Sequence, residues 1–129
     1  MGIIKRLFGS QIEVNNISNL DWNLLSDLTQ LDTIAKDSNT KTQVIFKHST
    51  RCGISSGVLR KFEKQFGASN SIVLHFLDLL RYRDISNEIA SRFDVAHQSP
   101  QLLVIKNGVV AKYDSHYGIL ELDIAEYQL

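Results

Sequence analysis

Residues 43–55 read Gln-Val-Ile-Phe-Lys-His-Ser-Thr-Arg-Cys-Gly-Ile-Ser, and this stretch decides the fold. The β-branched and aromatic run 43–48 has the length and composition of a buried strand. The polar residues 49–51 end the strand, and a helix pattern opens at Cys52 or Gly53. The apolar residues of this pattern recur at helical spacing: Ile54, Val58, Leu59, Phe62 and Phe66. The stretch therefore predicts a strand that passes directly into a helix, with a cysteine at the junction.

Further elements are predicted on both sides of this unit. Before it we expect an edge strand at 22–25 and a helix at 26–36. After it we expect a strand at 72–77, a helix with Asp84 as its N-cap, a strand at 101–106, a returning strand at 109–113, and a closing helix carrying Leu120, Ile124 and Tyr127. The Asn107-Gly108 pair between the last two strands is a strong hairpin signal.

The resulting order is β-α-β-α-β-α-β-β-α, which predicts an α/β fold. Alternating strands and helices favour a largely parallel central sheet with helices on both faces, and the final hairpin makes the sheet mixed. This is the element order of the thioredoxin fold. We expect residues 1–20 to form an N-terminal extension and residues 21–129 a single thioredoxin-like domain.

Composition excludes several classes of function. Lys+Arg and Asp+Glu both number 14, so the chain has no net field that would attract nucleic acid or an anionic membrane. No apolar run is long enough to span a bilayer, and we expect a cytoplasmic protein. The single cysteine excludes an intramolecular disulfide and a multi-cysteine zinc site, and the four histidines have no metal-site spacing.

Cys52 is the candidate nucleophile. It lies where a helix begins, and unpaired backbone N–H groups and the helix dipole favour an anion there. With Arg51 beside it, the thiol is expected to form the reactive thiolate. The alternative is an inert core thiol, because free cysteine is among the most buried residue types.

Two further positions bear on this thiol. Ser55 stands three residues after Cys52, on the same helix face, where its hydroxyl is expected to hydrogen-bond the sulfur or to satisfy a first-turn N–H. A serine cannot resolve a mixed disulfide, so an adduct on Cys52 must leave by attack of an external thiol. Pro100 precedes a strand, and we expect a cis peptide bond from Ser99 that faces Cys52 in a thioredoxin fold.

The octet His48-Ser49-Thr50-Arg51-Cys52-Gly53-Ile54-Ser55, together with Ser99-Pro100-Gln101 and Ser115-His116-Tyr117, resembles bacilliredoxin-type proteins of the bacillithiol system (the YtxJ family). The likeness runs from about Leu28 to the C-terminus, and the octet is its most specific part. It implies that Cys52 accepts bacillithiol from S-bacillithiolated proteins. A bacillithiol–disulfide reductase or free bacillithiol would then restore the thiol.

One residue departs from that family's motif, because Gly53 stands where the motif has proline. Cys-Gly-Ile-Ser is also similar to the Cys-Gly-Phe-Ser of monothiol glutaredoxins, which hold a [2Fe–2S] cluster between two protomers with glutathione. The chain lacks their Gly-Gly-x-Asp-like segment after the hairpin. An iron–sulfur carrier or a redox sensor is therefore the alternative to a thiol–disulfide oxidoreductase.

The sequence thus predicts a monothiol oxidoreductase with Cys52 as its catalytic residue. The supporting or ligand-binding candidates are Thr50, Arg51, Gly53, Ser55, Ser99, Pro100 and His116. No bound cofactor is expected, and a small thiol, bacillithiol by the resemblance, serves as co-substrate. Expected partners are S-thiolated client proteins, the small thiol and a disulfide reductase. His48 and His75 are interpreted as structural, whereas His97 and His116 are expected near the Cys52 end.

Overall fold

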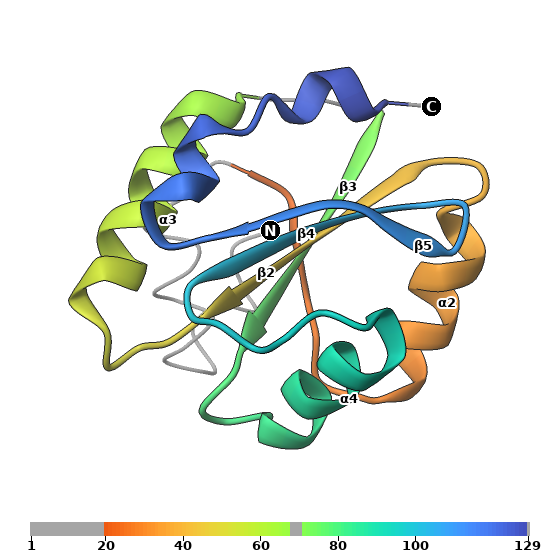
Figure 1. The fold of residues 1–129 in the computed structure, drawn as a ribbon, viewed down its shortest axis with the longest axis horizontal. Coiled ribbons are helices and arrows are strands. Elements are labelled where there is room, and N and C mark those ends of the chain that lie inside the picture. Colours follow the sequence, from red (N-terminus) through yellow and green to blue (C-terminus); the bar gives the residue numbers. More distant parts are fainter. Residues whose placement is uncertain (1–19, 68–70, 129) are drawn as a thin grey trace, which may run out of the picture.

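The computed structural model describes residues 20–67 and 71–128, in which a five-stranded sheet lies between helices (Figure 1). The elements in chain order are β1 (Trp22–Leu24), α2 (Thr29–Asp37), β2 (Thr42–His48), α3 (Gly53–Phe66), β3 (Ile72–Asp78), α4 (Arg83–Phe93), β4 (Gln101–Lys106), β5 (Val109–Ser115) and the 3-10 helices η2 (His116–Glu121) and η3 (Ile124–Tyr127). The predicted extension, residues 1–20, lies outside the described residues except for Leu20, so that prediction stays open.

The sheet has the strand order β1-β3-β2-β4-β5. The strands β1 and β2 run parallel to β3, whereas β4 is antiparallel to β2 and β5 is antiparallel to β4. This is the mixed sheet that the element order predicts. Because Lys47 of β2 lies opposite Gln101 of β4, the end of β2 and the start of β4 meet at one edge of the sheet.

Two apolar layers hold the helices against the sheet. All seven residues of β2 are buried, and its side chains alternate between the layers. One layer joins α2 and α4 to the sheet through Leu31, Ile34, Ile45, Ile85, Ile89 and Leu103. The other joins α3 and the 3-10 helices to the opposite face through Val44, Phe46, Leu59, Phe62, Ile119 and Ile124. In Figure 1, α3 and the C-terminal segment accordingly lie across the sheet from α4.

The predicted turns are confirmed. Asn107 and Gly108 both have positive φ, 53° and 80°, as the tight turn of a hairpin with matched strand twist requires. Helix α3 ends at Phe66, and Gly67 follows with φ of 68°, a conformation that a residue with a Cβ rarely adopts.

The prediction of a closing α-helix is wrong, because the structure has two separate 3-10 helices there, η2 and η3. Leu122, between them, is extended, with ψ of 136°, and breaks the helical path. The prediction grouped Leu120, Ile124 and Tyr127 by their spacing, whereas the buried side chains are Ile119 and Ile124. These two residues are five positions apart, a spacing that would not place them on one face of an α-helix.

Asp84 is not the N-cap of α4. The helix begins at Arg83, and Tyr82 is at the N-cap, with its carbonyl accepting hydrogen bonds from Ile85 N and Ser86 N. Asp84 lies one residue inside, where its carboxylate accepts a hydrogen bond from Ile85 N at 2.9 Å. It still supplies negative charge to the first turn, where the helix dipole favours it.

Candidate active site

Cys52 lies at the junction that the sequence predicts. It is the N-cap residue of α3, with extended backbone at φ −109° and ψ 117°, and its thiol is free and half-buried. Its N–H donates to the Ser49 carbonyl at 3.2 Å, and its own carbonyl accepts from Ser56 N at 3.2 Å. The backbone of this turn is therefore fixed on both sides of the sulfur, while the side chain remains accessible.

Ser55 does not hydrogen-bond the sulfur, which corrects the first of the two predictions for it. Its fully buried hydroxyl accepts a hydrogen bond from Ser49 N at 3.1 Å and lies 2.8 Å from Nδ1 of His48. Burial lowers the pKa of His48, although Asp78 opposes the shift, so the neutral ring can offer Nδ1 as an acceptor. Ser55 thus fastens the first turn of α3 to the end of β2.

Pro100, immediately before β4, lies at the same end of the sheet as the turn that leads to Cys52. The Ser99–Pro100 peptide bond is cis, as predicted, and immediately precedes β4. The Pro100 carbonyl accepts a hydrogen bond from His116 N at 2.9 Å, so the residue that follows β5 is tied to the proline. The register of β2 and β4 places Pro100 next to the end of β2, where the turn to Cys52 begins.

The remaining motif residues line this turn without contributing to the core. Thr50, Arg51 and Gly53 are exposed, and Arg51 forms no ion pair with any described residue. A Cβ at Gly53 would meet nothing within 4 Å, so there is space for the first carbon of a side chain at this first helical position, where proline is common.

One histidine lies where it was predicted, and two others make contacts that the sequence does not indicate. His116 reaches the proline, as expected, and is exposed with a left-handed φ of 55°. His97 instead turns its Nδ1 toward Lys47 and Ser86, each 3.3 Å away, on the α4 side of the sheet. His48, interpreted only as structural, lies directly behind the Cys52 turn. No local spacing shows this contact, because it depends on how β2 packs under α3.

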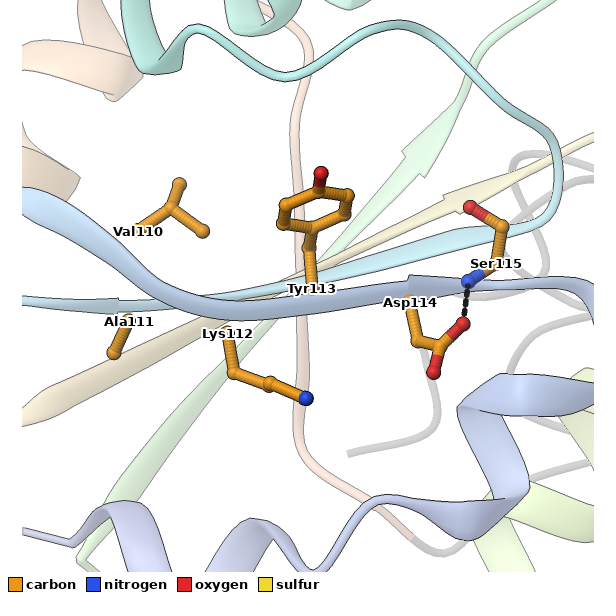
Figure 2. Close-up of a pocket in the computed structure, with 6 residues that line it drawn as sticks. All are labelled: Val110, Ala111, Lys112, Tyr113, Asp114 and Ser115. Carbon is orange, nitrogen blue, oxygen red and sulfur yellow. Dashed lines mark hydrogen bonds between the residues drawn. The ribbon is translucent and has the colours of Figure 1, made fainter.

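The segment after β5 brings Asp114 close to Gly118. Figure 2 shows the Asp114 carboxylate accepting a hydrogen bond from Ser115 N, at 2.8 Å. A Cβ on Gly118 would collide with that carboxylate, so the Asp114 side chain would have to shift to admit any larger residue there. The shallow hollow of about 430 Å³ in the same view is lined by residues 110–115. It contains none of the predicted site residues, and we place the site at Cys52.

Within the described ranges 20–67 and 71–128, no group of three or more His, Cys, Asp or Glu side chains could hold a metal ion. Across those same residues, no helix has the length and apolar character needed to cross a membrane.

Several solved structures share the fold of this chain. A chain described as an oxidoreductase with a thioredoxin fold is 26% identical, with a TM-score of 0.67, and the match covers 81% of this chain and 88% of that one. Thioredoxin from Malassezia sympodialis is 19% identical, with a TM-score of 0.66 and coverage of 83% and 90%. Thioredoxin from Fasciola hepatica is 18% identical, with a TM-score of 0.63 and coverage of 82% and 99%.

The shared fold, with one accessible thiol at the start of α3, makes this chain a thioredoxin-fold redox protein. The model of the family described as monothiol bacilliredoxin BrxC matches residues 23–124. The chain belongs to the monothiol bacilliredoxin family.

Proposed function

We propose that the protein removes bacillithiol from S-bacillithiolated proteins by thiol–disulfide exchange at Cys52. The observation that carries the proposal is the site itself. The only thiol in the chain lies half-buried at the N-cap of α3, and the residue three positions on is a serine whose hydroxyl is committed to other partners. Membership of the monothiol bacilliredoxin family supports bacillithiol as the small thiol.

The exchange follows from thiolate chemistry. The Cys52 thiolate attacks the bacillithiol sulfur of the client's mixed disulfide, a Cys52–bacillithiol disulfide forms, and the client disulfide breaks. The client cysteine leaves as a thiolate and takes up a proton. This step involves no net oxidation or reduction, because one disulfide replaces another.

Restoring Cys52 needs a second thiol from outside the chain. Free bacillithiol attacks the adduct, releases Cys52 as a thiolate and forms bacillithiol disulfide, which a disulfide reductase would then reduce. We therefore propose bacillithiol as co-substrate, no bound cofactor, and cytoplasmic S-thiolated proteins as clients.

The test of the thiol assignment compares one client protein carrying either bacillithiol or glutathione on the same cysteine. We expect the bacillithiolated client to react faster by about tenfold or more, which corresponds to about 1.4 kcal/mol of preference in the transition state. The measurement is the release of unmodified client, followed by whole-protein mass.

Two outcomes would count against this proposal in different ways. Equal rates with the two clients would leave the exchange chemistry standing and remove bacillithiol as the specific thiol. No release from either client would contradict the exchange itself.

A further inference from the structure

Lys47 is a buried charged residue that the proposed mechanism does not use. Its side chain is fully buried near the end of β2, on the α4 side of the sheet. The two ion pairs found between described residues both involve Arg92, and Lys47 forms none with a described carboxylate. Burial lowers the pKa of Lys47 to about 8. An apolar side chain would avoid this desolvation, so fold stability alone does not explain a lysine here.

The hydrogen bonds of Lys47 join α4 to the loop that precedes the cis proline. Its Nζ donates to the Ser86 carbonyl of α4 and contacts Nδ1 of His97, both at 3.3 Å. His97 lies in the loop 94–99, between α4 and β4. The Ser86 hydroxyl contacts the same ring nitrogen at 3.3 Å.

A second side chain holds the same loop from the neighbouring strand. Gln101 is fully buried, lies opposite Lys47 in the register of β2 and β4, and donates from Nε2 to the Ala96 carbonyl at 3.0 Å. Val95 N also donates to the Ala90 carbonyl at the end of α4. Consecutive loop residues 95–97 are thus each anchored, and the chain then enters Ser99–Pro100 at the edge where Cys52 is presented.

We propose that Lys47 is a positioning residue, which fastens the loop 94–99 to α4 through His97 and so holds Ser99–Pro100 in place beside the Cys52 turn. The proposal rests on the proposed function, because it assigns this segment to guiding the mixed disulfide toward the thiol. Lys47 lies on the face of the sheet opposite α3. Its effect on exchange therefore passes through the loop and not through the sulfur.

The test separates the reactivity of Cys52 from the positioning of its substrate. Lys47→Met removes the donor and keeps an unbranched side chain of similar length. We expect transfer from a bacillithiolated client to fall by about tenfold or more, because small misplacement of a reactant is costly. Alkylation of Cys52 by iodoacetamide, which needs no guiding segment, should change by less than about twofold.

A matched pair at His97 covers the case in which Lys47→Met does not fold. His97→Asn keeps an acceptor oxygen near the place of Nδ1 and should retain most of the transfer rate, whereas His97→Leu should lose it. Amide hydrogen exchange of residues 95–99 gives a readout independent of activity. The exchange of these amides should accelerate in His97→Leu and stay close to wild type in His97→Asn.

The outcomes distinguish this inference from the proposed function. The positioning role is contradicted if wild type transfers bacillithiol, His97→Leu and His97→Asn both transfer it at the same rate, and amide hydrogen exchange of residues 95–99 is unchanged in both. If transfer and alkylation fall together in Lys47→Met, the lysine acts on the thiol or the whole fold, which also overturns the proposal. If wild type itself transfers nothing, the proposed function fails, and accelerated loop exchange in His97→Leu alone still supports the anchoring role.

Discussion

Replacing Cys52 with serine should abolish removal of bacillithiol from a client protein. Exchange requires a sulfur nucleophile, and the chain has no second thiol to substitute for Cys52. The serine hydroxyl would remain protonated at neutral pH and cannot form a disulfide. The client's mass, followed over time, should therefore stay at the bacillithiolated value in the presence of the variant.

A control variant on the same helix separates loss of chemistry from loss of fold. Ser56 lies one turn into α3, and its backbone N–H donates a hydrogen bond to the Cys52 carbonyl. Ser56→Ala keeps that backbone bond and should retain transfer. If Cys52→Ser releases the client as fast as wild type, the thiol is not the reacting group and the mechanism is contradicted.

Acidification should destabilise the protein through His75, by about 3 kcal/mol between pH 6.5 and 4. His75 is buried in β3, and its Nε2–H donates to Oε1 of Gln43 at 2.7 Å. The amide nitrogen of Gln43 donates to the Lys41 carbonyl, so its oxygen must face the ring. Burial lowers the pKa of His75 to about 4, against a weaker opposing effect of Asp37.

The sign follows from proton binding. The folded pKa lies below that of the unfolded chain, so the unfolded state binds more protons as the pH falls below about 6.5. The stabilising contribution of the neutral ring is complete above that pH and is lost progressively down to about pH 4.

Chemical unfolding at a series of pH values measures this loss. His75→Gln can keep a neutral N–H donor toward Gln43 but cannot titrate. The difference in unfolding free energy between wild type and His75→Gln should therefore shift by about 3 kcal/mol across the interval. A constant difference from pH 6.5 to 4 would show that His75 titrates alike in both states.

The main architecture could be predicted from the sequence because the signals for its strands, turn and helix start are local. The run 43–48 predicts a strand by composition alone, the Asn107-Gly108 pair predicts its turn by backbone preference, and Cys52 was placed at a helix start by the pattern that follows it. The order of these elements was enough to predict a mixed sheet with helices on both faces. These features need no knowledge of long-range contacts.

The missed features depend on contacts between elements. Helical spacing put Ser55 beside Cys52, but its hydroxyl turns to His48, which approaches from the strand beneath. The role of Lys47 likewise depends on the burial of β2 on both faces of the sheet. A lysine that follows an uninterrupted apolar run was the available signal, because such runs indicate a central strand with no solvent-facing side.

The most direct test of the account is the mass of this protein after one turnover without added small thiol. Mixed with a bacillithiolated client, wild type should gain one bacillithiol moiety as the client loses one, and the adduct should persist. Addition of free bacillithiol should then return the protein to its original mass. A client that loses bacillithiol while Cys52 stays unmodified, or an adduct that resolves with no external thiol, would contradict monothiol exchange at Cys52.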